Sequence, residues 1–154
     1  MPPTILIADD HDIVRQGIRA TIARLRPEWE ICGEVSNGKD AVEAVQNLNP
    51  DVVILDVTMP VMGGLDAARQ IAKLGLAARI LVFTMHESVR MARDVRNAGA
   101  HGYVRKSEAA RDLIAALEAL LSGGTFGFQG QEIDESGEKS GPNSPACFRV
   151  FVFA

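Results

Sequence analysis

Short apolar runs alternate with segments of helical periodicity along most of the chain. The runs are rich in Ile, Val and Leu, which favours buried β-strands. Each run is followed by a stretch in which apolar residues recur every three or four positions, which is typical of a helix with one buried face. Alternation of this kind predicts an α/β fold with a parallel sheet covered on both faces. The expected strands are residues 5–8, 31–35, 52–55, 80–83 and 103–105.

The helical segments carry their own boundary signals. Pro27 and Asn49-Pro50 end the first two, and glycines occupy the positions where helical C-caps are expected, at Gly75, Gly99 and Gly123-Gly124. The apolar stripes are Val14, Ile18, Thr21, Ile22 and Leu25; Ala41, Val42, Val45 and Leu48; Leu65, Ala68, Ile71 and Ala72; residues 89–98; and Leu113, Ile114, Leu117, Leu120 and Leu121.

The character of the chain changes beyond the last of these helices. Residues 123–146 are rich in Gly, Ser and acidic side chains and have little apolar periodicity, so we expect a structured domain over 1–122 and a disordered tail over 123–154. Residues 147–154 are strongly apolar and β-prone. Strand addition, contact with a partner and aggregation remain open for them, as does a non-native end from a truncation or an altered reading frame.

Length and composition limit the alternatives. With 154 residues and 47% hydrophobic content, the chain suits one domain with a substantial core. The net charge of -4, without long charged blocks, gives little support to nucleic-acid binding. No segment has the length or apolar character of a leader or a membrane span, so we expect a cytoplasmic protein with no membrane contact. The two cysteines match no metal-binding spacing.

Four of the apolar runs end at residues that could form a phosphoryl-transfer site. The runs lead to Asp9-Asp10, Asp56, Thr84 and Lys106. Because parallel strands end at one edge of a sheet, these side chains should converge there. Clustered carboxylates suit Mg²⁺, which would offset their repulsion and dock a phosphate donor. Asp56 could then attack phosphorus, while the Thr84 hydroxyl and the Lys106 ammonium bind the phosphoryl oxygens.

These motifs closely resemble the receiver domain of bacterial two-component response regulators, and in detail the NarL/FixJ type. The resemblance covers residues 4–121, and it implies a flavodoxin-like (βα)₅ fold, a doubly wound parallel sheet with strand order 2-1-3-4-5. The segments that carry it are Asp9-Asp10-His11, Asp56-Val57-Thr58-Met59-Pro60, Thr84-Met85-His86 and Tyr103-Val104-Arg105-Lys106.

The resemblance also implies roles for individual residues. Asp56 is expected to accept a phosphoryl group from a sensor histidine kinase. Asp10, Asp56 and the Thr58 backbone carbonyl are expected to hold Mg²⁺, and Asp9 to support the metal through water. Thr84 and Tyr103 are then the switch residues that move towards the phosphoryl group. Such a protein is not an enzyme but a phosphoacceptor that assists its own phosphorylation and dephosphorylation; its expected partners are the kinase, a downstream protein and a second copy of itself.

The chain also departs from the family pattern. Many receivers carry Lys-Pro where this chain has Lys106-Ser107, so the cis bond that proline favours is not carried over. The resemblance further leads one to expect a helix-turn-helix domain after the receiver, yet residues 123–154 show no such pattern. We therefore expect no direct sequence-specific DNA binding by this polypeptide.

Two other function classes compete with the phosphoacceptor. One is a phosphorylation-independent interaction or dimerisation module, derived from a truncated transcriptional regulator. The other is a Mg²⁺-dependent phosphatase of the haloacid dehalogenase type, which also uses Asp, Thr and Lys. The phosphatase needs an Asp two residues after its nucleophile, and Thr58 occupies that position after Asp56.

Overall fold

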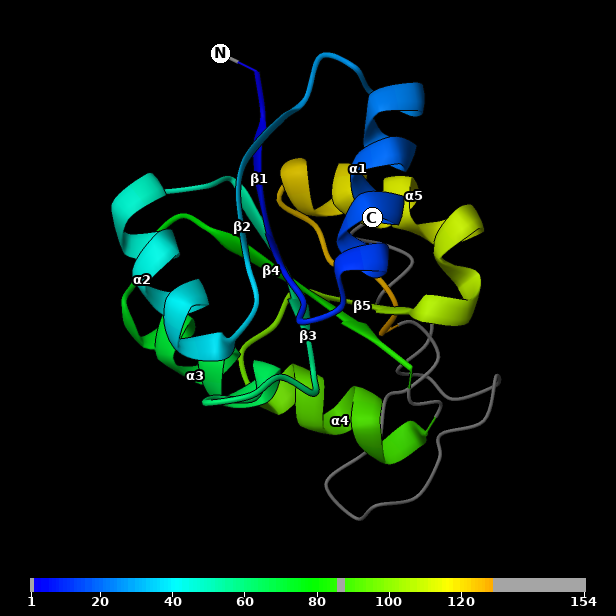
Figure 1. Ribbon diagram of the computed structural model, residues 1–154. Coiled ribbons are helices and arrows are strands. Elements are labelled where there is room, and N and C mark those ends of the chain that lie inside the picture. Colours follow the sequence, from blue (N-terminus) through cyan, green and yellow to red (C-terminus); the bar gives the residue numbers. More distant parts are fainter. Residues whose placement is uncertain (1, 86–87, 129–154) are drawn as a thin grey trace.

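The computed structural model describes residues 2–85 and 88–128, and within them strands and helices alternate strictly (Figure 1). Every predicted strand and helix is present, and each strand begins and ends within one residue of the expected position. The strands are β1 (Thr4–Ala8), β2 (Glu30–Val35), β3 (Val52–Asp56), β4 (Arg79–Thr84) and β5 (Gly102–Arg105). The helices are α1 (Asp12–Leu25), α2 (Gly38–Leu48), α3 (Gly64–Lys73), α4 (Val89–Asn97) and α5 (Ala109–Leu121), with a short 3₁₀ turn at Lys106–Glu108.

The five strands form one parallel sheet in the order β2-β1-β3-β4-β5. The predicted flavodoxin-like topology is therefore confirmed. The order reverses between β1 and β3, and a crevice at this reversal is where doubly wound sheets place their ligands. The register sets Asp56 at the end of β3 opposite Phe83, and Thr84 at the end of β4 opposite Arg105.

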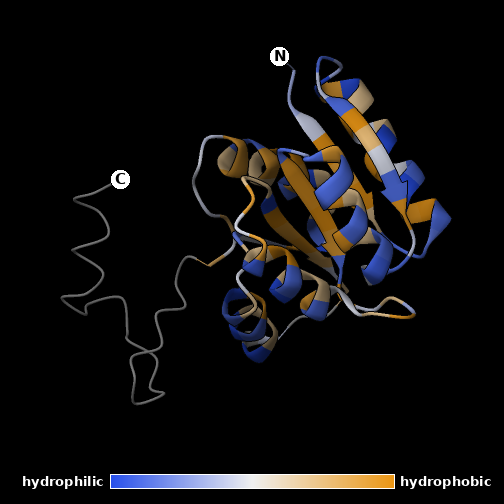
Figure 2. Cartoon of the chain, turned by 90° about the vertical axis from the view of Figure 1, so that its left-hand side faces the viewer, coloured by the Kyte–Doolittle hydropathy of each residue, from blue (hydrophilic) through white to orange (hydrophobic). Residues whose placement is uncertain are grey.

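The sheet separates two hydrophobic clusters, one on each face. Figure 2 shows the central strands coloured as hydrophobic and the helices, coloured partly hydrophilic, around them. The first cluster packs Leu6, Val53 and Ile80 against α2, α3 and α4. The second packs Ile5, Ile54 and Leu81 against α1 and α5. Adjacent strand residues belong to opposite clusters because side chains alternate across a strand. The central strand β3 is consequently buried along its whole length, which explains its uninterrupted apolar sequence.

Local sequence signals account for the helix boundaries. The side chain of Asn37 accepts a hydrogen bond from the Asp40 amide at the start of α2, and Ser88 accepts one from the Met91 amide at the start of α4. The glycine caps predicted at Gly75, Gly99 and Gly123 all adopt positive φ, at 65°, 92° and 87°. Only glycine enters this left-handed region without steric cost, so the sequence signal is physically direct.

The chain after α5 differs from the structureless tail expected from residue 123. Residues 123–128 turn back and hydrogen-bond to the outer edge of β5, where Phe126 bridges Gly102. The apolar segment 147–154 lies outside the described residues. Within the described ranges no peptide bond is cis, so Lys106–Ser107 is trans. No helix there is long and apolar enough to cross a membrane.

Candidate functional site

The polar residues predicted to converge do meet at the carboxyl end of the sheet. Asp9 follows β1, Asp56 ends β3 and Thr84 ends β4. Their exposed fractions are 1%, 4% and 0%, and they are the buried polar or charged residues among those described. Polar side chains are rarely buried this completely without a functional or structural role.

Lys106 supplies a positive charge to this group. It directly follows β5, in the 3₁₀ turn that leads to α5, and its side chain is 9% exposed. Its Nζ lies 2.8 Å from Asp9 Oδ2 and 3.2 Å from Asp56 Oδ1. The ammonium also lies 5.8 Å from the centre of the Phe83 ring. Because an ammonium group loses its hydration when it is buried, Lys106 needs both carboxylates as partners at this position.

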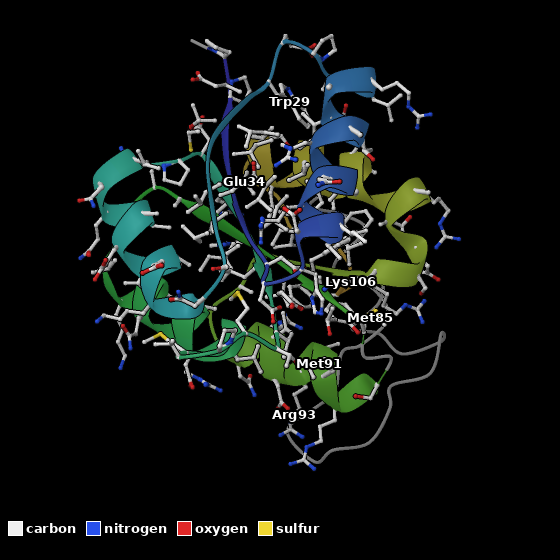
Figure 3. The ribbon with its side chains drawn as sticks, in the orientation of Figure 1. Trp29, Glu34, Met85, Met91, Arg93 and Lys106 are labelled. Carbon is white, nitrogen blue, oxygen red and sulfur yellow. The ribbon has the colours of Figure 1, made fainter. Side chains whose placement is uncertain are left out.

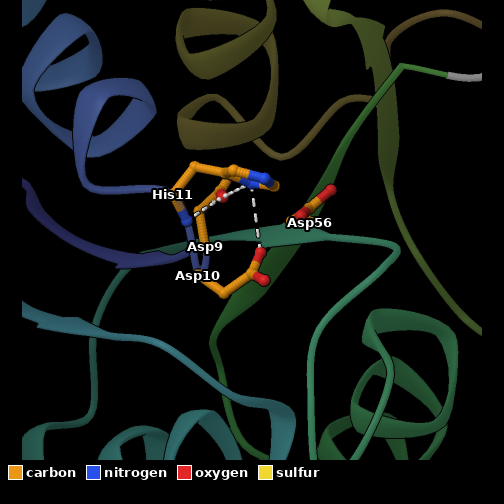
Figure 4. Close-up of side chains that lie close together, drawn as sticks. All are labelled: Asp9, Asp10, His11 and Asp56. Atoms are coloured by element: carbon orange, nitrogen blue, oxygen red, sulfur yellow. Dashed lines mark hydrogen bonds and ion pairs between the residues drawn. The ribbon is translucent and has the colours of Figure 1, made fainter.

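Asp10 and His11 complete the rim of the site (Figure 4). The imidazole Nδ1 of His11 lies 3.1 Å from Asp9 Oδ1 and 3.1 Å from Asp10 Oδ1. One ligand atom from each of Asp9, Asp10, His11 and Asp56 lies within 4.8 Å of the others. Three carboxylates converging at one point form an acidic pocket with the hard oxygen donors that Mg²⁺ prefers, so the donor set fits this ion.

The pKa of Asp56 is raised above that of an ordinary aspartate. Burial is the main cause, because it disfavours the charged carboxylate, and the negative charge of Asp9 adds to it. The ammonium of Lys106 acts in the opposite direction without overcoming them. The site places three carboxylates, from Asp9, Asp10 and Asp56, beside the one ammonium of Lys106, which favours a further cation or an electrophile.

The loop between β3 and α3 presses closely on the site. A Cβ at Gly64, the first residue of α3 after this loop, would lie 1.9 Å from the Asp56 carbonyl oxygen, so only glycine fits there. Earlier in the chain, within the loop, Val61 adopts φ 68°, and the Met62 amide donates to the Pro60 carbonyl at 2.7 Å. Positive φ is strained for a β-branched residue, and the 81% exposed Val61 side chain gains little packing in return. The same loop carries Thr58, whose side chain is exposed.

Tyr103 stands apart from the carboxylates. It lies half-buried in the middle of β5, opposite Val82 of β4, and packs against the cluster on the α4 side of the sheet. The structure therefore brings Asp9, Asp10, Asp56, Thr84 and Lys106 to the carboxyl end of the sheet. Tyr103 lies two residues before the end of β5.

Two residues of the site were not assigned to it from the sequence. His11 touches both members of the acidic pair, and its position directly after Asp10 was the available signal. Arg15 donates from its guanidinium to the Asp9 carbonyl at 2.6 Å and contacts Glu34 at 3.3 Å. Its helical position on α1 indicates only a surface residue, and the fold alone turns it towards Asp9.

Comparison with known proteins agrees with this architecture. Residues 5–118 match the family model described as the response regulator receiver domain. The nitrate/nitrite response regulator NarL of Escherichia coli K12 is 34% identical over 122 residues, which cover 79% of this chain and 56% of NarL. UvrY, a response regulator of the same organism, is 36% identical over 119 residues, covering 77% of this chain and 54% of UvrY.

Solved structures give the same result. A LuxR-family two-component response regulator from Aurantimonas has a TM-score of 0.77 and 39% identity, covering 82% of this chain and 90% of that one. The isolated receiver domain of RcsB from Salmonella enterica, determined with the phosphomimetic BeF₃⁻, has a TM-score of 0.74 and 29% identity, covering 82% and 93%.

The chain spans about half the length of the curated relatives it matches, from 51% to 56%. The shared half contains all the strands, the acidic residues, Thr84 and Lys106. The chain belongs to the response regulator receiver domain family of two-component systems, and its relatives are regulators of the NarL, UvrY and DegU type.

Proposed function

We propose that Asp56 accepts a phosphoryl group from a phosphohistidine of a sensor kinase and that this charge switches the domain between two conformations. An Asp56 carboxylate oxygen attacks phosphorus, and an O–P bond forms. The P–N bond to the donor imidazole breaks, and its electron pair stays on the nitrogen. The product is an aspartyl phosphate, and the same domain assists its later hydrolysis.

The observation that carries this proposal is the contact of one ammonium with two buried carboxylates. Lys106 touches both Asp9 and Asp56, burial and the nearby Asp9 charge raise the pKa of Asp56, and the Thr84 hydroxyl group belongs to the neighbouring strand end. Lys106 and Thr84 are thus placed to bind phosphoryl oxygens as charge moves onto them. Figure 3 shows Lys106 and Met85 at this end of the sheet.

Mg²⁺ fits the acidic pocket as the cofactor of this reaction. Asp10, Asp56 and the Thr58 carbonyl would hold it, with Asp9 acting through water. When bound, the ion offsets the charge of the carboxylates and of the incoming phosphate. Asp10 is the most exposed of the three carboxylates, with 32% of its side chain accessible, so it can reach an ion that enters from solvent.

The proposed switch uses Thr84 and Tyr103. The phosphoryl group draws Thr84 towards it, and Tyr103 turns inward on the adjacent strand, which changes the surface formed by α4, β5 and α5. A sensor kinase is the upstream partner, and the altered surface contacts a downstream protein or a second receiver. The NarL and UvrY relatives are both named as response regulators, which supports this assignment.

Intact-mass analysis with Mg²⁺ and acetyl phosphate tests the chemistry. The wild type should gain one phosphoryl group and Asp56→Asn none, because the amide is a poor nucleophile. Asp51→Asn, at the opposite end of β3, is the matched control and should gain as the wild type does. A folded wild type that gains nothing in Mg²⁺ would contradict the proposal and favour the phosphorylation-independent module.

A further inference from the structure

The chain reverses direction directly after α5. Gly123 adopts φ 87°, its amide donates to the Leu120 carbonyl at 3.0 Å, and the Gly124 amide donates to the Ala119 carbonyl at 2.9 Å. This pair of bonds is a Schellman C-cap. The guanidinium of Arg79 then donates to the Gly123 and Gly124 carbonyls, at 3.1 Å and 2.7 Å. The next residues are thereby sent back along the outer edge of β5.

Residues 125–128, here called the β5 clamp, hydrogen-bond to that edge. The Tyr103 amide donates to the Phe126 carbonyl at 3.0 Å, and the Phe126 amide donates to the His101 carbonyl at 3.2 Å. Among residues up to 128, which the structure describes, the pairing is parallel and consists of one bridge, between Gly102 and Phe126. An uncovered edge strand readily pairs with other chains, so the clamp protects β5 through very few bonds.

The two phenylalanines of the clamp grip opposite faces of the sheet. Phe126 packs against the cluster on the α1 and α5 side, and Phe128 against the cluster on the α4 side. Residues two apart in a regular strand point to the same face. Gly127 breaks that rule with φ 87°, and a Cβ there would lie 2.2 Å from the Tyr103 carbonyl oxygen. Glycine at this position therefore makes the two-sided grip feasible.

Phe128 brings the clamp against α4, the helix that carries the labelled Met91 and Arg93 in Figure 3. The Arg96 guanidinium lies 5.9 Å from the centre of the Phe128 ring. Met91 and Tyr103 pack, like Phe128, against the α4-side cluster. The clamp thus occupies the surface between α4 and β5.

The clamp and the acidic site share one short strand. Tyr103 bonds to the clamp through its backbone, and it precedes Lys106 by three residues. Lys106 contacts Asp9 and Asp56. Because β5 has only four residues, a shift of Lys106 or Tyr103 moves the backbone to which the clamp is bonded.

We propose that phosphorylation of Asp56 releases the β5 clamp, an inference that rests on the proposed function. Lys106 turns from Asp9 to the phosphoryl oxygens, and Tyr103 moves inward. Phe128 then loses part of its packing on the α4 side of the sheet. The unphosphorylated domain keeps the β5 edge covered, and the phosphorylated domain exposes it together with the α4 surface. Coupling is reciprocal, so a weakened clamp must favour the phosphorylated conformation.

Hydrogen exchange of single amides in the full chain, followed by NMR, tests the release. Mg²⁺ with beryllofluoride serves as a lasting mimic of the phosphoryl group. The Tyr103 amide should exchange at least about tenfold faster with the mimic bound, because its partner Phe126 leaves. The His101 amide, which donates to the Ile80 carbonyl in β4 at 2.9 Å, should keep its rate and so report an intact sheet.

Glycine variants provide matched controls. Gly127→Ala places a methyl group against the Tyr103 carbonyl. The Tyr103 amide should therefore exchange rapidly even without beryllofluoride, and beryllofluoride should not raise its exchange rate further. Gly17→Ala, in α1, meets no heavy atom within 4 Å and should behave as the wild type does. If Gly127→Ala does not fold, Phe128→Ala serves instead, with faster Tyr103 exchange and about threefold tighter beryllofluoride binding expected from reciprocal coupling.

The outcomes separate the two proposals. Phosphoryl gain at Asp56 with an unchanged Tyr103 exchange rate would overturn the clamp proposal and leave the phosphoacceptor intact. Equal acceleration of Tyr103 and His101 would show general loosening of β5, and would also overturn it. Absence of phosphoryl gain in the mass experiment would instead contradict the proposed function itself.

Discussion

The two ends of the sheet treat their charged groups in opposite ways. At the amino end, Asp51 Oδ2 accepts hydrogen bonds from the Thr4 amide at 2.8 Å and the Thr4 hydroxyl at 3.2 Å. The Asp51 amide in turn donates to the Thr4 side chain at 3.1 Å. At the carboxyl end, Asp9, Asp10 and Asp56 crowd together around Lys106 and His11.

The difference shows where this domain gives up stability for chemistry. The Asp51 carboxylate accepts hydrogen bonds from neutral donors and thereby connects β1 to the start of β3. The Asp56 carboxylate lies near another acid, and burial raises its pKa. Charged groups whose placement lowers the stability of the fold are characteristic of functional sites, because a bound ion or substrate supplies the missing interaction. The carboxyl end is accordingly built for an added cation, and the amino end for folding.

Removal of the Lys106 charge should have the largest effect on stability. Lys106→Met should lower the free energy of unfolding by about 3 kcal/mol, because buried carboxylates lose their cation. Urea unfolding followed by the fluorescence of the single tryptophan, Trp29, measures it. Millimolar Mg²⁺ should restore part of the loss. The exposed Lys73→Met is the control, and an equal loss there would contradict this account.

A substitution at the amino end of the sheet should change stability and leave phosphorylation unchanged. Asp51→Ala should lower the free energy of unfolding by about 1.5 kcal/mol, because the Thr4 donors lose their acceptor. The rate of phosphoryl gain from acetyl phosphate should stay that of the wild type. A slower phosphoryl gain in this variant would contradict the proposal that the amino end of the sheet serves folding and the carboxyl end serves chemistry.

The raised pKa of Asp56 gives a dependence of stability on pH. The folded state binds this proton more tightly than the unfolded state does. The stabilisation that this proton provides is therefore complete below the unfolded pKa of about 4, and it is lost as pH rises through the pKa of Asp56 in the folded state. Asp56→Asn should remove this dependence and, at neutral pH without Mg²⁺, be more stable than the wild type by about 1 kcal/mol. Parallel stability curves for the two proteins across pH would refute the prediction.

The strained loop at the carboxyl end should give the smallest effect. Val61→Gly should raise the free energy of unfolding by about 0.5 kcal/mol, because relief of the positive φ slightly outweighs the added freedom of glycine in the unfolded chain. Val42→Gly, in the ordinary helical backbone of α2, should instead destabilise the protein. Thermal unfolding of both variants makes the comparison, and destabilisation by Val61→Gly would show that the turn is not strained.

The fold was predictable because local periodicity and tertiary burial agree along the chain. The fully buried β3 is a plain apolar run, and the glycine-capped helices end where positive φ is required. The convergence of Asp9, Asp56 and Thr84 followed from the parallel arrangement, since the carboxyl ends of the strands share an edge. The parts that escaped prediction involve long side chains or chain reversal: Arg15 folds back onto Asp9, and residues 125–128 return to β5.

The sequence by itself determined the α/β alternation, the strand ends that carry the acidic, Thr and Lys residues, and the glycine stops, because these depend on local periodicity and backbone conformation. Only the tertiary structure decided that Lys106 divides its charge between Asp9 and Asp56, that His11 bridges the acidic pair and that Phe126 and Phe128 grip both faces of β5. Such contacts depend on side-chain reach and on which strands become neighbours, and neither property is written in the spacing of residues along the chain.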